Sequence, residues 1–386
     1  MSIPLFLSEI FILVKNTFGQ SNKVELVRLP NKMAIHLEIG SIKMPQNNVK
    51  NLRVVSLFSG CGGMDLGFKK EGYAIVFAND IATQVQETYE FNLKHEIQIE
   101  DIRTFDKSEI PQANVIIAGI PCQPFSNAGN RKSTGDADGN LFLQVLEVIT
   151  AQQTRPEVVV FENVRGFLSS RDENGILLTD RFSAEMRQLG YNTFYKLLNA
   201  ADFGVPSNRY RVFIVCVLSE LGKNFFFPEV SENIRPETVG NILSKKLPNK
   251  ESAEVWDLPP SSQKIVKFIP EGGSWKNIPD GKLSERFLKI RRDPKKYRAP
   301  NFYRRFARSE VMGTITATSS PENSGILHPL EDRRYSVREV ARFQSFPDSF
   351  RFLGKNISAK YKMIGNAVPP RLAQVIAKAI RDHVFD

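Results

Sequence analysis

Cys122 is the side chain in this 386-residue chain whose position best suits nucleophilic chemistry. It lies between Pro121 and Pro124, directly after the apolar stretch 115–120. A lone cysteine is usually a small core residue, and Cys216, inside an apolar stretch, fits that description. Prolines do not suit a strand interior, so Cys122 is expected in a stiff loop at a strand end. A thiolate there could attack an electron-poor carbon of a substrate.

Ionisable side chains also accompany two further apolar stretches. Glu162 comes directly after 158–161, and the pair Arg209 and Arg211 opens the stretch that ends at 218. Taken alone, Glu162 would be interpreted as a surface carboxylate that caps a turn. If these stretches are strands of one sheet, ligand-facing residues gather beyond one edge, where the acid and the guanidiniums would meet Cys122. Such a group could move a proton and stabilise developing charge.

A glycine-rich turn suggests nucleoside binding at the same edge. The run Phe58-Ser59-Gly60-Cys61-Gly62-Gly63 ends the first stretch, and Asp80 follows about twenty residues later. Glycines let the backbone approach a ligand closely, and a carboxylate so placed can accept hydrogen bonds from ribose hydroxyls. For the glycines alone, a plain tight turn is the alternative. The absence of Gly-x-Gly-x-x-Gly and Gly-Lys-Ser/Thr argues against dinucleotide and P-loop phosphate binding.

The elements that must position these residues alternate along the chain. Apolar stretches with β-branched residues predict strands, and helix-compatible stretches lie between several of them. Strands are expected at 54–58, 74–78, 115–120, 158–161 and 211–218, and helices at 141–152 and 180–189. This alternation is typical of an α/β fold with a largely parallel sheet covered on both faces.

The alternation stops after about residue 219. From there to about 333 the chain is rich in Pro, Lys, Asn and Ser, and helical patterns return at 336–344 and 370–383. The first fifty residues show no clear periodicity. The predicted parts are an extension of unknown role (1–51), a catalytic domain (52–218), a second, irregular domain (219–354) and a segment that returns to the catalytic domain (355–386).

Charge and composition narrow the class of partner. The chain has 52 Lys and Arg against 42 Asp and Glu, a net charge of +10 that suggests a polyanion. The segment Lys282–Arg308 holds eleven basic residues, two acids and five aromatic residues, so it carries +9 of that charge. It could grip phosphates and stack on bases, or be a solvated surface with core aromatics.

Other counts exclude several classes. Three cysteines exclude a disulfide framework, and the four histidines form no spaced cluster with them, so no metal site is predicted. The longest apolar-leaning run, Ile3–Val14, is too short to span a bilayer and is interpreted as a packed helix or strand.

Taken together, the motifs resemble those of C5-cytosine DNA methyltransferases of the bacterial restriction–modification type. Six of them occur in the family's order, from about Arg53 to the C-terminus. They are Phe58–Gly63, Pro121-Cys122-Gln123, Glu162-Asn163-Val164, Arg209 with Arg211, Arg338–Pro347 and Gly365–Pro370. One motif could arise by chance, but six in order could not.

The resemblance implies a Rossmann-like S-adenosylmethionine-dependent methyltransferase sheet and a target-recognition domain at 219–354. Cys122 would add to C6 of a cytosine flipped out of duplex DNA, and C5 would take the methyl group. Glu162 would hydrogen-bond N3 and the exocyclic amine, Arg211 would hold O2, and Arg209 would support the same pocket. The cofactor-binding residues implied are Phe58, Ser59, Gly60, Gly62, Gly63, Asp80, Ile81, Asp101, Ile102, Pro121, Leu141, Asn366, Ala367 and Val368.

Two departures from the family's pattern bear on this site. Ser56 stands where an acid is common, and Ser207 stands where glutamine is common. The first affects a polar contact near the methionine moiety and the second a link to the pocket arginines, but no reacting group is lost.

Two other functions remain open. A C5-cytosine tRNA methyltransferase would share the cysteine loop and the Glu-Asn-Val motif, although the long basic module favours DNA. A DNA-binding relative without catalysis is disfavoured by the intact Cys122, Glu162 and Arg211. The implied protein is a monomer in the bacterial cytoplasm, associated with the nucleoid and not with a membrane. It would have a companion restriction endonuclease that acts on the same site without stable binding.

Overall fold

The computed structural model describes residues 51–120, 141–172, 174–248, 253–293 and 301–386, and the backbone of two strands before them. The chain forms two compact units, Met1–Val49 and Lys50–Asp386, which we describe separately. In the first unit, β1 (Phe11–Lys15) pairs antiparallel with β2 (Val24–Arg28).

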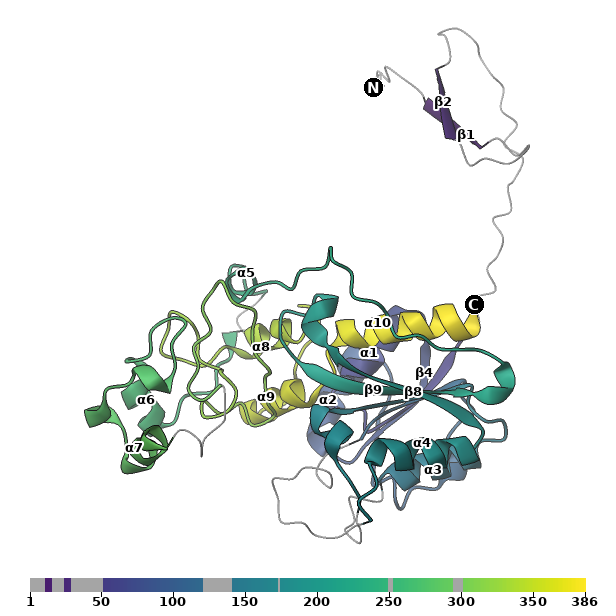
Figure 1. The fold of residues 1–386 in the computed structure, drawn as a ribbon, viewed down its shortest axis with the longest axis horizontal. Coiled ribbons are helices and arrows are strands. Elements are labelled where there is room, and N and C mark those ends of the chain that lie inside the picture. Colours follow the sequence, from purple (N-terminus) through teal and green to yellow (C-terminus); the bar gives the residue numbers. More distant parts are fainter. Residues whose placement is uncertain are drawn as a thin grey trace. The chain divides into compact units, whose positions relative to one another are not determined.

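The second unit is built on a seven-stranded sheet (Figure 1). Its strands are β3 (Arg53–Leu57), β4 (Ala74–Asp80), β5 (Gln98–Ile99), β6 (Val115–Gly119), β7 (Val158–Val164), β8 (Tyr191–Asn199) and β9 (Tyr210–Leu218). They lie in the order β5-β4-β3-β6-β7-β9-β8. The first five are parallel to one another, and β9 is antiparallel to both of its neighbours. The amino end of β9 therefore lies at the edge where β3, β4, β6 and β7 end.

Helices cover both faces of the sheet, as the sequence predicts (Figure 1). On one face, α1 (Gly63–Lys70) and α10 (Pro370–Ile380) pack on the side chains that include Val54 and Val115. On the other face, α3 (Leu141–Ala151) and α4 (Leu178–Gln188) pack on those that include Val55 and Ile116. Adjacent residues of a strand point to opposite faces, so a continuous apolar run fills both cores.

The remaining helices are α2 (Gln86–Leu93), α5 (Val239–Leu243), α6 (Pro260–Val266), α7 (Glu285–Arg292), α8 (Val337–Phe343) and α9 (Ile357–Asn366). Helices α6 and α7 belong to a small separate core around Leu258, Trp275, Phe302 and Leu327. Ser336 begins α8 with a capping box to Glu339, which satisfies backbone donors at both ends of the motif. The division of residues 52–386 at 218 and 354 remains a prediction.

The five predicted strands and the helices α3, α4, α8 and α10 are confirmed within a few residues. Strand β7 continues three residues beyond the prediction because Glu162 and Asn163 pair with Phe213 and Val212 of β9. The edge strand β8 was not predicted, since the polar residues in Tyr191–Asn199 conceal its alternation. No helix among the described residues is long and apolar enough to cross a membrane.

Candidate active site

The glycine-rich run forms the turn between β3 and α1. Phe58 adopts a φ of 55°, which costs a residue with a Cβ about 1 kcal/mol and is typical of functional turns. The amide of Ser59 donates to the Asn79 carbonyl at 3.0 Å, and Gly62 precedes α1 with a φ of 84°. The turn is thus held against the end of β4, as the sequence predicts.

Asp80 holds the same turn with its carboxylate. The amide of Gly60 donates to Oδ2 and that of Ala82 to Oδ1, each at 2.8 Å. Burial raises the pKa of Asp80 above its ordinary value, and these hydrogen bonds oppose the shift. Ile81 leaves 63% of its surface exposed beside this carboxylate. A fixed acceptor with an apolar side chain next to it fits a ribose and its base.

Asp101 and Ile102 follow β5, next to the end of β4, where the Glu100 amide donates to the Asp80 carbonyl. Arg103 engages the Asp101 carboxylate with Nε at 3.0 Å and lowers its pKa. Ile102 is 2% exposed and belongs to the core, so only its backbone can face a ligand. Leu141 starts α3 and is half-buried.

The carboxyl-terminal segment reaches the glycine turn, as the resemblance implies. A Cβ on Gly63 would lie 2.4 Å from the Val368 carbonyl oxygen and 3.2 Å from the Cβ of Ala367. Only glycine allows this approach. Asn366 is exposed at the end of α9 and Val368 is 6% exposed. Gly63 and the pair Ala367 and Val368, which the sequence predicts to bind the cofactor, are therefore neighbours in space.

A buried acid beneath this turn was not predicted. Asp65, in the first turn of α1, is completely buried and accepts a hydrogen bond from Tyr89 at 2.6 Å. Ser56 is also completely buried, and its Oγ lies 2.8 Å from that of Ser59. Burial raises the pKa of Asp65 to about 6.

Glu162 and Arg211 form the ionic centre of the site. Arg211 Nε lies 2.7 Å from Glu162 Oε1, and the two side chains are 12% and 10% exposed. They come from opposite ends of adjacent antiparallel strands, so the pair lies at the edge of the sheet that carries the glycine turn. A partly desolvated ion pair of this kind can offer both an acceptor and a donor to a flat polar ligand.

Arg209 behaves differently from Arg211. Its side chain is completely buried, and its guanidinium donates to the carbonyls of Ile315 at 3.0 Å and of Gly365 and Ala367 at 2.9 Å. It therefore binds the backbone of two distant segments. The sequence predicts that Arg209 supports the substrate pocket. Its hydrogen bonds hold backbone segments at 315 and 365–367, so that support is indirect.

Cys122 and Pro121 lie outside the described residues. The strand that leads to them ends at Gly119, which pairs in register with Glu162. Glu162, Arg211, Asp80 and the glycine turn are therefore brought to one edge, next to the strand from which the cysteine loop starts.

The basic segment Lys282–Arg308 is only partly available to a polyanion. Its described aromatic side chains, among them Phe302 and Tyr303, are buried, so the expectation that they stack on bases is wrong. Arg304 pairs with Glu310 at 2.6 Å, and Arg305, 2% exposed, donates to the carbonyls of His328 and Glu331. The basic side chains exposed on or beside α7 include Lys282, Lys289 and Arg292.

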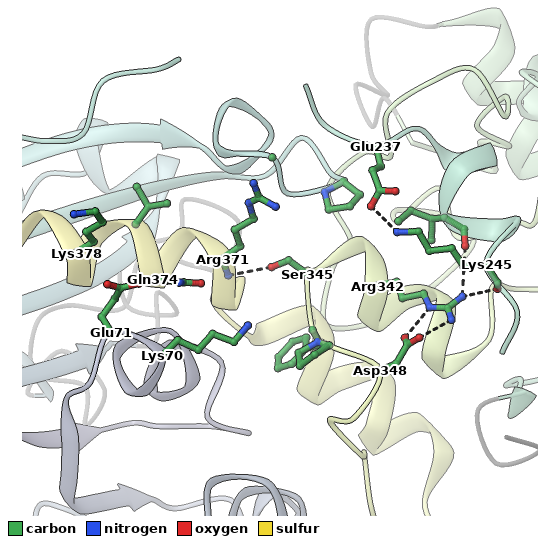
Figure 2. Close-up of a pocket in the computed structure, with 16 residues that line it drawn as sticks. Lys70, Glu71, Glu237, Lys245, Arg342, Ser345, Asp348, Arg371, Gln374 and Lys378 are labelled. Atoms are coloured by element: carbon green, nitrogen blue, oxygen red, sulfur yellow. Dashed lines mark hydrogen bonds and ion pairs between the residues drawn. The ribbon is translucent and has the colours of Figure 1, made fainter. Parts of the chain in front are cut away.

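A cavity of about 580 Å³ lies elsewhere, between the carboxyl end of α1, α10 and the end of α8 (Figure 2). Its charged side chains are largely committed to partners, with Lys245 bound to Glu237 at 2.7 Å and Arg342 to Asp348 at 2.8 Å. None of the predicted site residues lines it. The site is thus not this cavity but the edge of the sheet.

A largely parallel sheet whose last strand is antiparallel, with a glycine turn after its first strand and a carboxylate after its second, is typical of α/β proteins that bind a nucleoside at one edge of the sheet. Residues 52–382 match the family model of the C-5 cytosine-specific DNA methylases, and the chain belongs to that family.

Named relatives are similar over most of their length. Type II methyltransferase M.NgoFVII of Neisseria gonorrhoeae is 33% identical over 353 residues, which cover 89% of this chain and 89% of that protein. Type II methyltransferase M.FnuDI of Fusobacterium nucleatum is 33% identical over 346 residues, which cover 87% and 96%.

Solved structures share the fold. The methyltransferase EhMeth of Entamoeba histolytica superposes with a TM-score of 0.63 at 17% identity, covering 86% of this chain and 98% of that one. The Dnmt2 methyltransferase of S. pombe gives a TM-score of 0.56 at 22% identity, covering 86% and 99%. These likenesses confirm the Rossmann-like α/β architecture.

Proposed function

We propose that this protein methylates C5 of cytosine in duplex DNA within a restriction–modification system. The observation that carries the proposal is the Glu162–Arg211 ion pair, 2.7 Å long, beside the strand that leads into the Cys122 loop. Family membership over residues 52–382 supports the choice of cytosine C5.

Cytosine C5 is a poor nucleophile, and side chains of this protein would make it more nucleophilic. The Cys122 thiolate adds to C6, a C–S bond forms and the electron pair of the C5–C6 double bond becomes available at C5. Glu162 hydrogen-bonds N3 and the exocyclic amine, and Arg211 holds O2, so charge that develops on the ring is stabilised. After C5 is methylated, a base or water removes its proton and the thiolate leaves.

The residues at the glycine turn fit S-adenosylmethionine, which when bound supplies an electrophilic methyl group. Asp80 would accept hydrogen bonds from the ribose hydroxyls, since the amides of Gly60 and Ala82 already hold its carboxylate in place. Phe58 and Ile81 would contact the adenine, and the backbone at Asp101 and Ile102 would read its edge. The segment Asn366-Ala367-Val368 would close the other side.

Duplex DNA is the favoured substrate over tRNA because α7 exposes Lys289 and Arg292 on a module of more than one hundred residues. The names of the relatives, Type II methyltransferases, further support DNA and a companion endonuclease acting on the same sequence. We place the activity in the bacterial cytoplasm, on the nucleoid.

Transfer of tritium from S-adenosylmethionine tests this function. We expect label in duplex DNA and none in tRNA, and a covalent complex of the protein with 5-fluorocytosine DNA. Cys122→Ser should abolish both label transfer and the covalent complex. Label in tRNA alone would replace the proposal by the tRNA reaction, and no transfer to any cytosine-rich substrate would leave a binding protein. Trapping by Cys122→Ser would show that another residue is the nucleophile.

A further inference from the structure

The chain just before β9 contacts a segment more than one hundred residues away. The amide of Asn208 donates to the Met312 carbonyl at 2.8 Å, and the Thr314 hydroxyl donates to the Asn208 carbonyl at 2.6 Å. Ser207 forms a parallel bridge with Met312. Residues 207–209 therefore fix the strip Met312–Thr316, which lies in the predicted target-recognition module.

Arg209 extends this link to the cofactor segment. One end of its guanidinium, Nη1, donates to Ile315 in the strip, and the other, Nη2, donates to Gly365 and Ala367. Among the described residues, the hydrogen-bond partners of this fully buried guanidinium are backbone carbonyls, and the Glu162 carboxylate stabilises its charge through space. A planar guanidinium can bridge two backbones in this way, whereas the single ammonium of lysine cannot.

The two segments also touch each other and the glycine turn. A Cβ on Gly365 would lie 2.4 Å from the Thr316 carbonyl oxygen, so the strip and the end of α9 are in backbone contact. The same segment continues to Val368, whose carbonyl blocks a Cβ on Gly63. A continuous path of contacts thus runs from the strip through Gly365–Val368 to the cofactor turn.

We infer that Arg209 is a positioning residue that couples DNA binding in the target-recognition module to cofactor binding at the glycine turn. Its hydrogen bonds go to backbone carbonyls of the strip and of the segment 365–367. Movement of the strip on DNA moves Gly365–Ala367 with it, because both are bonded to one rigid guanidinium. Arg211, two residues further along the chain, forms the ion pair with Glu162. The same part of the chain therefore also positions that ion pair. This inference rests on the proposed function.

The test measures coupling. The dissociation constant of S-adenosylhomocysteine is determined by calorimetry without and with duplex DNA that holds the recognition sequence, and the ratio of the two is the coupling factor. Coupling between sites is typically 5–150-fold. We expect a wild-type ratio in that range and a ratio near one for Arg209→Lys. Because the ratio compares two affinities of the same variant, a change in the affinity for S-adenosylhomocysteine alone does not alter it.

Arg305→Lys is the matched control. Arg305 is also buried and donates to carbonyls, but its carbonyl partners, at 266, 328 and 331, all lie within the recognition module. It should lower stability yet keep the wild-type ratio. If Arg209→Lys does not fold, Thr314→Val weakens the same link at an exposed bond and should lower the ratio.

The outcomes separate the two proposals. A wild type that transfers no methyl group to DNA contradicts the proposed function. A wild type that methylates DNA while its ratio is one, or while Arg209→Lys (or Thr314→Val in its place) retains the wild-type ratio, overturns the coupling role of Arg209. An equal loss in Arg305→Lys would also overturn it, because general destabilisation would then explain the effect.

Discussion

Arg209 and Arg211, at the start of β9, look equivalent in the sequence but make different contacts. Arg211 remains slightly exposed and pairs with Glu162, whereas Arg209 is completely buried and binds backbone carbonyls. Residues two apart within a strand share a face, but Arg209 precedes β9, so this alternation does not apply to it. We therefore propose that Arg211 acts at the cytosine and that Arg209 positions the surrounding chain.

Replacing Glu162 by Gln tests the ionic centre. The change keeps the shape of the side chain but removes its charge, so we expect kcat to fall by about 10²–10⁴-fold with little change in S-adenosylhomocysteine affinity. Single-turnover methyl transfer measures this. Glu185→Gln is the matched control, because Glu185 also pairs with an arginine, Arg181, but on α4. Equal losses in both variants would contradict the assignment.

Asp65 makes a prediction about pH. Burial raises its pKa to about 6 from an ordinary 3.8, so the folded state binds more protons than the unfolded state between these values. The contribution of Asp65 to stability is therefore fully present below about pH 4 and is lost as pH rises through about 6. The loss is at most about 3 kcal/mol.

Asp65→Asn should remove this dependence. The free energy of unfolding of the variant, relative to wild type, should rise between pH 4 and 6, because only the wild type loses stability as Asp65 ionises, and should then level off. The amide oxygen of the variant can still accept the hydrogen bond from Tyr89. Urea denaturation across this range measures the difference, in which the other ionisable groups cancel. A difference independent of pH would show that Asp65 is ionised throughout.

At the scale of elements, only part of the positive charge on and around α7 is exposed to solvent. Several arginines of Lys282–Arg308 are committed to internal partners, such as Arg308 to Glu271 at 3.0 Å. Its described aromatic residues are buried, three of them in the small core of α6 and α7. Lys282, Lys289 and Arg292 are exposed, and we propose that they contact the phosphates of DNA. The amount of charge in a segment thus overstates what a nucleic acid can reach.

Reversing these three charges to Glu should weaken DNA binding and reduce its dependence on salt. Each phosphate contact contributes about 0.9 to the slope of log K against log salt concentration, and the slope should shrink accordingly. Fluorescence anisotropy between low and moderate salt measures it. Lys196→Glu, an exposed change on β8, should leave the slope unaltered. An unchanged slope in the triple variant would remove α7 from the DNA-binding surface.

The elements also show what the sequence could predict. The buried strands and the glycine turn carry strong local signals, namely apolar β-branched runs and a change of period, and all are confirmed. Strand β8 and the Arg209 contacts carry none, because edge strands mix polar residues and carbonyl partners are independent of side-chain identity. Asp65 had a weak signal, an acid in the first turn after the glycines, but only tertiary packing buries it.

At the scale of the whole Lys50–Asp386 unit, the sheet edge gathers residues from the entire sequence. The glycine turn at 58–63 contacts the segment at 366–368, Arg209 binds the carbonyls of Gly365 and Ala367, and Glu162 lies near the end of β7 at the same edge. Under the proposed function, methyl transfer and target recognition depend on this one set of contacts.

Bisulfite sequencing of DNA from cells that express the protein tests the central claim most directly. We predict that cytosines at one position of a short recurring sequence resist conversion with the wild type, and that all cytosines convert with Cys122→Ser. Complete conversion with the wild type, or the same protected positions with Cys122→Ser, would contradict a cytosine-5 DNA methyltransferase that acts through Cys122.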